Sequence, residues 1–122
     1  MAAGTLHLAG RLRIDQGATW TVTLTWKIAG VAVNLTGYSA RMQARSTVDS
    51  DEVILSLTSG PGGGITLGGV AGTIVLSMAA DETQDLVPGN DYCYDLELVA
   101  GDGVTVTRLV EGRLEVKAEV TR

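Results

Sequence analysis

The 122-residue sequence has no phenylalanine, a single cysteine, a single histidine and two prolines. One cysteine, Cys93, excludes an intrachain disulfide and a cysteine-based zinc site, so packing must supply the stability. We expect Cys93 to be a small buried or half-buried apolar filler. The one histidine, His7, has no clustered nucleophile beside it, so we expect an ordinary exposed residue and a protein that is not an enzyme.

Basic residues are also scarce, with nine Lys plus Arg against fourteen Asp plus Glu and a net charge of −5. Such a chain repels a phosphate backbone at long range, and we expect no nucleic-acid partner. The longest apolar runs fall far below the roughly 18 residues of a membrane-spanning helix, and no signal-peptide pattern opens the sequence. We therefore expect no membrane partner and synthesis in the cytoplasm of a host cell.

The clearest positive signal is strict alternation over residues 19–28, which read TWTVTLTWKI. Tryptophan, valine, leucine and isoleucine occupy one parity, and threonine and lysine occupy the other. A period of two sends alternate side chains to opposite faces of a sheet, and β-branched residues suit that pleat. This segment is predicted to be a β-strand with one buried face.

Glycine-rich turn signals recur at short intervals along the rest of the chain. They separate predicted strands at about residues 5–14, 18–28, 31–35, 38–46, 52–58, 64–67, 72–78, 91–99 and 104–117. Many short strands with such turns indicate a sandwich or barrel, here an all-β fold in one domain. Residues 79–86 depart from the pattern and predict one short helix, with acids at its N-terminus and Leu86 or Val87 against the sheet.

Alternation within these strands predicts which side chains point inward. In the last strand the parity breaks at Arg108, and a β-bulge within residues 108–112 would repair it, with Gly112 as the permissive residue. The predicted inward set is Trp20, Val22, Leu24, Trp26, Tyr38, Ala40, Met42, Ala44, Val53, Leu55, Leu57, Ile65, Leu67, Ile74, Leu76, Met78, Tyr92, Tyr94, Leu96, Leu98, Val110, Leu114 and Val116.

Two acidic clusters and one glycine run were candidates for ligand binding. The first cluster lacks the turn glycine and ligand spacing of a calcium loop, and the second is explained by the helix terminus, so no metal or cofactor is expected. The glycine run at residues 60–64 has no following lysine or helix, and we expect a flexible hairpin loop. The acidic clusters are Asp49, Asp51 and Glu52, and Asp81, Glu82 and Asp85.

The N-terminal segment has an apolar parity of its own, formed by Leu6, Leu8, Leu12 and Ile14. One interpretation is an edge strand of the domain's own sheet. The other is an arm, residues 1–14, that pairs with a neighbouring subunit by strand addition and precedes a single sandwich domain at residues 15–122. On the second interpretation these four residues form an interface and the protein is a homo-oligomer.

Several stretches together resemble small virion proteins of tailed bacteriophages and prophages related to the N-terminal domain of baseplate upper protein. They are residues 16–19 (QGAT), 24–26 (LTW), 33–45 (VNLTGYSARMQAR), 72–76 (GTIVL), 94–98 (YDLEL), 108–112 (RLVEG) and 120–122 (VTR). The resemblance covers about residues 14–122, and the segment before Ile14 departs from it.

This resemblance implies an immunoglobulin-like antiparallel β-sandwich that serves as an attachment module and carries no catalytic residues. The expected function is a non-enzymatic structural protein of a bacteriophage virion, in the tail, baseplate or a fibre connection, with other virion proteins as partners. Alternatives are a capsid decoration protein, or a carbohydrate- or calcium-binding β module. Aromatic residues on inward parities argue against a sugar site.

Overall fold

A computed structural model describes residues 12–121 of the chain. Most of this part is β-structure, as the alternation predicts. The elements are β1 (Leu12–Asp15), β2 (Trp20–Thr25), β3 (Lys27–Ile28), β4 (Val31–Ala32), β5 (Ser39–Arg45), β6 (Val53–Thr58), β7 (Ile65–Leu67), a 3-10 turn (Gly69–Ala71), β8 (Thr73–Met78), α1 (Ala80–Thr83), β9 (Gly89–Val99) and β10 (Val106–Lys117).

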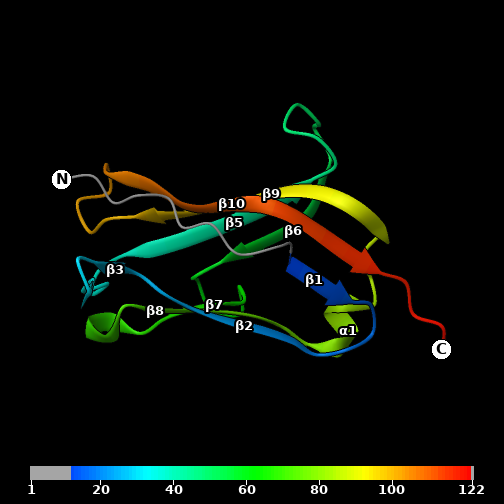
Figure 1. The fold of residues 1–122 in the computed structure, drawn as a ribbon, viewed down its shortest axis with the longest axis horizontal. Coiled ribbons are helices and arrows are strands. Elements are labelled where there is room, and N and C mark those ends of the chain that lie inside the picture. Colours follow the sequence, from blue (N-terminus) through cyan, green and yellow to red (C-terminus); the bar gives the residue numbers. More distant parts are fainter. Residues whose placement is uncertain (1–11, 122) are drawn as a thin grey trace.

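Two sheets pack face to face as a sandwich (Figure 1). The larger sheet has the strand order β1-β10-β9-β5-β6, and the smaller has the order β2-β8-β7. Neighbouring strands run antiparallel except β1, which pairs in parallel with β10. The small hairpin β3-β4 stands apart from both sheets. The predicted all-β sandwich is therefore confirmed.

The core lies between the sheets and is built from the predicted parities. All but one of the predicted inward residues are buried or pack partly buried against the core. Val53 is the exception and the prediction was wrong there: it begins the edge strand β6, at a register shift opposite Ala44 and Arg45, and is 36% exposed. Leu35, Leu86 and Leu109 are core residues that the alternation did not identify.

The predicted bulge in the last strand is present, but it is not centred on the predicted residue Gly112. Pairing of β10 with β9 shifts between Arg108 and Val110, so Leu109 is the extra residue, and both Leu109 and Val110 are fully buried. Gly112 pairs with Tyr94 beyond the bulge, which corrects its predicted role. A Cβ at Gly112 would lie 3.4 Å from the Tyr94 ring, so glycine makes room for that ring.

Helix α1 is shorter than the predicted segment 79–86 and spans one turn. The Glu82 carboxylate accepts a hydrogen bond from the Ala79 backbone N–H at 2.9 Å and caps its start. Leu86 is buried beyond the helix end, as predicted, whereas Val87 is 57% exposed. The buried Thr83 hydroxyl accepts a bond from the Gly17 N–H at 3.0 Å and lies 2.9 Å from the Ala18 carbonyl, joining α1 to the turn before β2.

The N-terminal strand belongs to the domain's own sheet from residue 12 onward. Ile14 pairs opposite Val116 and is fully buried in the core, so it is not available to a neighbouring subunit, which corrects the predicted interface role. Leu12 is partly buried against the same core. The sandwich thus includes β1 and does not begin at residue 15. Leu6 and Leu8 lie outside the described residues.

Candidate functional site

Among the described residues, those considered for catalysis or metal binding are not brought together by the fold. His7 lies outside the described residues. Cys93 is half-buried, and its thiol lies 3.3 Å from the Arg45 carbonyl, which it can reach as a weak donor. In residues 12–121 no three His, Cys, Asp or Glu side chains are grouped closely enough to hold a metal ion. The same part of the chain has no helix long and apolar enough to cross a membrane.

The acidic clusters lie in connections at one end of the sandwich. Asp49, Asp51 and Glu52 are exposed in the segment between β5 and β6, while Asp81 and Glu82 are in α1. The Glu82 carboxylate is already used as the helix cap.

Two glycine-rich segments are turns. Residues 60–64 carry the chain from β6 of one sheet to β7 of the other, so this segment is a crossover and not the predicted hairpin loop. Asp102 shapes the β9-β10 hairpin: its carboxylate accepts hydrogen bonds from the Thr105 and Val104 backbone N–H groups at 2.9 and 2.8 Å. These bonds hold the pKa of Asp102 below its usual value.

On the outer face of the larger sheet, charged, amide and thiol side chains lie in three rows that cross β5, β9 and β10 in register. Strand β9 lies in the middle, and from Tyr92 to Leu98 its even-numbered side chains are in the core and its odd-numbered ones point outward. We call the resulting nine residues the ladder. Its rows are Arg41, Glu97 and Arg108; Gln43, Asp95 and Glu111; and Arg45, Cys93 and Arg113.

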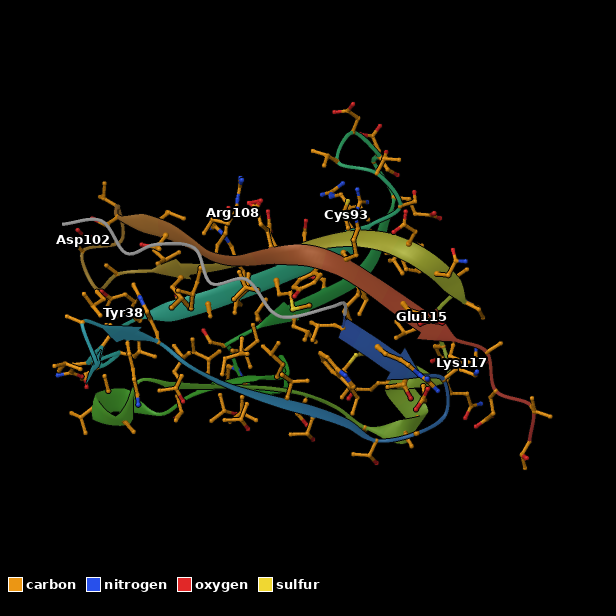
Figure 2. All side chains as sticks on the ribbon, viewed as in Figure 1. Tyr38, Cys93, Asp102, Arg108, Glu115 and Lys117 are labelled. Carbon is orange, nitrogen blue, oxygen red and sulfur yellow. The ribbon has the colours of Figure 1, made fainter. Side chains whose placement is uncertain are left out.

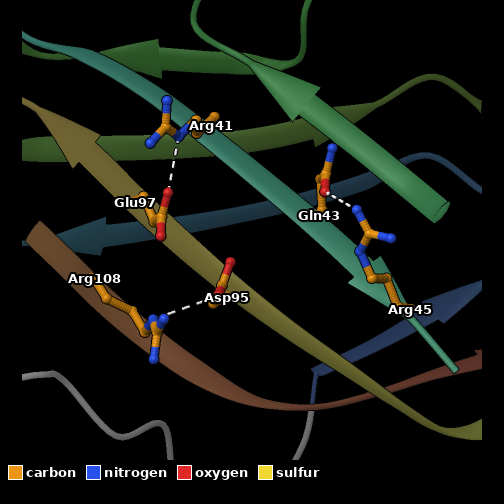
Figure 3. A network of polar contacts seen from close by, with 6 residues as sticks. All are labelled: Arg41, Gln43, Arg45, Asp95, Glu97 and Arg108. Atoms are coloured by element: carbon orange, nitrogen blue, oxygen red, sulfur yellow. Dashed lines mark hydrogen bonds and ion pairs between the residues drawn. The ribbon is translucent and has the colours of Figure 1, made fainter. Parts of the chain in front are cut away.

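Ion pairs connect neighbouring rows as well as neighbouring strands (Figure 3). The Arg41 Nε lies 2.8 Å from Glu97 Oε1. The Arg108 guanidinium lies 3.5 Å from the Asp95 carboxylate and 3.7 Å from that of Glu111. These side chains are about half exposed apart from the more buried Glu97, so each pair stabilises the fold by only about 0 to 1 kcal/mol. The ladder therefore contributes little to the stability of the fold, and its main property is the pattern of charges that it presents at the surface.

Arg45 differs from the other ladder arginines. Its guanidinium donates to the Ser50 carbonyl at 2.6 Å and to Gln43 Oε1 at 2.9 Å. No carboxylate within the described part of the chain lies within 4.0 Å of it. Its positive charge is fixed in place by neutral partners and remains uncompensated, which suits an incoming acidic group.

Asp95, in the middle row of the ladder, has a perturbed pKa. Partial burial raises its pKa above the usual value, and Glu97 raises it further, whereas Arg108 acts in the opposite direction. The middle row thus carries two carboxylates, Asp95 and Glu111, that share the Arg108 guanidinium. By strand, the ladder carries two arginines on β5, two carboxylates on β9, and two arginines with one glutamate on β10.

The two outer faces of the sandwich differ strongly in charge. Six of the seven described basic residues lie in strands of the larger sheet, and Lys27 in β3 is the seventh. Strands β2, β7 and β8 of the smaller sheet contain no charged residue. Figure 2 shows Arg108 and Cys93 on the side of the larger sheet that faces away from the smaller one. Among the strands of the two sheets, charged residues are therefore confined to the larger sheet.

No protein-family model matches the sequence, and no curated protein matches it. Solved structures do match the fold. One is the NK cell receptor Nkp44, described as a triggering partner in natural cytotoxicity, with a TM-score of 0.51 and 14% sequence identity over 89% of this chain and 100% of that chain. The fold is immunoglobulin-like. At this identity the similarity establishes architecture alone.

The strand order agrees with this assignment. In variable-type immunoglobulin domains an additional strand extends the sheet that holds the last two strands, as β6 extends β10-β9-β5 here. The Tyr92 hydroxyl lies 2.8 Å from the Val87 carbonyl and 3.2 Å from that of Pro88, which is the tyrosine-corner contact at the start of the penultimate strand. Antibody domains place a disulfide cysteine two residues later, and here that core position is Tyr94.

The inward set predicted from the sequence leaves five ladder residues on the opposite, outward parity, namely Arg41, Gln43, Arg45, Asp95 and Glu97. It did not identify Arg108, Glu111 and Arg113 as members of the same rows, because the bulge at Leu109 resets their register.

Proposed function

We propose that this chain is a non-enzymatic structural and attachment protein of a bacteriophage virion, in the tail, the baseplate or a fibre connection. Its partners are other virion proteins, and it acts by holding them in place. The proposal takes its biological setting from the resemblance of residues 14–122 to phage virion proteins. It takes its docking surface from the ladder.

The ladder is the observation that carries a docking role. Its residues lie on three paired strands, so its side chains are attached to a rigid scaffold and need little backbone ordering on contact. Its alternating charges select a partner of complementary pattern and penalise partners of the wrong sign. Arg45 provides one fixed positive charge for an acidic side chain of that partner.

Carbohydrate and calcium binding receive less support. Trp20, Trp26, Tyr92 and Tyr94 are buried, and Tyr38 packs edge-on against Trp26, so their rings are not displayed as stacking platforms for sugars. The acidic segment between β5 and β6 shows no calcium-type ligand spacing. Capsid decoration uses the same docking chemistry and differs from tail attachment only in location.

Charge reversal in one ladder row tests this function. In the producing host, Arg41→Glu with Arg108→Glu places three glutamates in one row, and we expect purified particles to contain at least about tenfold less of the protein, equivalent to about 1.4 kcal/mol of docking energy. Lys27→Glu, an exposed reversal outside the larger sheet, is the matched control and should be incorporated normally.

Circular dichroism of the purified variants separates docking from folding. Normal incorporation of the double variant would show that the ladder is not the docking surface. Absence of the wild-type protein from particles would contradict the virion function itself.

A further inference from the structure

Strand β2 presents an open hydrogen-bonding edge. In the part of the chain that the structure describes, it pairs with β8 alone and lies at the margin of the smaller sheet (Figure 1). The Trp26 N–H donates to the Gly72 carbonyl at 2.9 Å and so continues the β2-β8 ladder. Residues of the same parity, such as Val22, direct their backbone groups toward β8. The four threonines at positions 19, 21, 23 and 25 therefore present their N–H and C=O groups at the open edge.

The other edges of the sandwich carry features that discourage strand addition, and β2 does not. Strand β1 has four residues and a charged pair, Arg13 and Asp15. Strand β7 has only three residues, and β6 is distorted by its register shift. Strand β2 has six residues in continuous register, with neither charge nor proline. Native proteins rarely leave such an edge uncovered.

The sequence of this edge is symmetrical about Val22. When two copies run antiparallel about a two-fold axis at Val22, Thr21 of one lies opposite Thr23 of the other, and Thr19 lies opposite Thr25. Within residues 12–121 the backbone groups of these threonines face away from β8 and have no strand partner, so each pair can exchange two backbone hydrogen bonds. Facing threonine side chains are a favourable cross-strand pair, and here no charge opposes another.

Burial at the edge agrees with the same arrangement. Val22 has inward parity yet is only partly buried, whereas Trp20 and Leu24 on either side are buried. In the two-fold arrangement Val22 packs against Val22 of the second copy, and Trp20 lies opposite Leu24. The one partly exposed apolar residue of the strand is then covered by its own counterpart.

We propose that two copies of this chain associate through β2 about a two-fold axis at Val22, joining their smaller sheets into one continuous six-stranded sheet. The interface is isologous, so it closes with two subunits and leaves both ladders free. This inference rests on the β2 edge and is independent of the virion function. It places self-association at β2 and not at the N-terminal residues.

Paired charge substitutions test the register directly. In Thr21→Lys with Thr23→Lys, lysine of one copy faces lysine of the other, and Thr21→Glu with Thr23→Glu does the same with carboxylates. Sedimentation velocity should give the wild-type chain about twice its 12.7 kDa mass and each double variant the monomer mass. Mixing the two variants should restore the dimer, because lysine then faces glutamate. Thr66→Lys, on the far strand β7, is the control and should stay dimeric.

Disulfide trapping provides a readout that does not depend on charge. In a Cys93→Ser background, Val22→Cys should form a covalent dimer on oxidation, because facing residues of this kind lie about 4.5 Å apart at Cα. Thr66→Cys is the control and should remain monomeric on a non-reducing gel.

A monomeric wild-type chain would overturn the proposal, and a chain that dimerises only after deletion of residues 1–11 would show that its own N-terminal segment fills the edge. A dimer that survives both charge variants and gives no Val22→Cys cross-link would place the interface elsewhere.

Discussion

Replacing Trp26 by alanine should remove a large aromatic side chain from the core, directly after β2. The indole is 4% exposed, and its ring meets that of Tyr38 edge to face, with centroids 6.2 Å apart and an interplanar angle of 85°. Deleting a buried tryptophan side chain costs about 3 to 5 kcal/mol. Loss of the edge-to-face contact with Tyr38, about 0.5 to 1.5 kcal/mol, is included in that range. We expect the free energy of unfolding to fall by about 3 to 5 kcal/mol.

Such a loss is a large share of the stability of a domain of this size, about 5 to 15 kcal/mol. Urea unfolding followed by circular dichroism should show it, together with a fall in Tm of about 10 to 20 °C. Lys27→Ala, an exposed change one residue away, is the control and should alter the free energy by less than about 0.5 kcal/mol. A change below about 1 kcal/mol for Trp26→Ala would refute the assignment of this ring to the core.

Three further predictions follow from named contacts. Tyr92→Phe removes the hydroxyl that reaches the Val87 carbonyl and should cost about 0.5 to 1.5 kcal/mol in urea unfolding; an unchanged midpoint would discount that bond. Burial raises the pKa of Tyr94 to about 12 from its unfolded value near 10, so the contribution of this residue to stability should be fully present below about pH 10 and be lost between there and pH 12, and Tyr94→Phe should lessen the decline of stability in that range. Calcium or chelator should leave Tm unchanged, because the exposed acids of residues 46–52 are not arranged as ligands, and a shift of several degrees with calcium would contradict this.

The core could be predicted from the sequence because alternation is a local property. The strand from Trp20 onward is an example. The alternation of threonine with apolar residues predicts which face is exposed to solvent, whichever strand lies beside it. The same logic failed at Val53, where the end of an edge strand and a register shift expose an inward parity.

Pairing could not be predicted because it depends on residues far apart in the sequence. Parallel pairing with Val116 buries Ile14 in the domain's own sheet. The apolar parity of its segment is equally compatible with a strand that pairs with another subunit. The ladder shows the same limit. Alternation marks Arg41 and Glu97 as outward, but only the register across β5 and β9 makes them a pair.

The short helix illustrates a third limit, which is the competition between helix and turn. Residues 79–86 have a favourable acidic N-terminus, yet the helix ends at Thr83, whose hydroxyl bonds backbone groups of the turn before β2. That tertiary contact has no signature in the helix sequence. Thr83 is accordingly the one buried polar residue of the described chain.

The central claim, attachment within a virion, is tested most directly by locating the wild-type protein on purified particles. Antibodies against the recombinant chain, viewed by immunogold electron microscopy, should label the tail, baseplate or fibre junction, and pre-incubation with free protein should abolish the label. Label confined to the head would support the capsid decoration alternative. Particles that carry no label, while the protein is abundant in the producing cells, would contradict the attachment function.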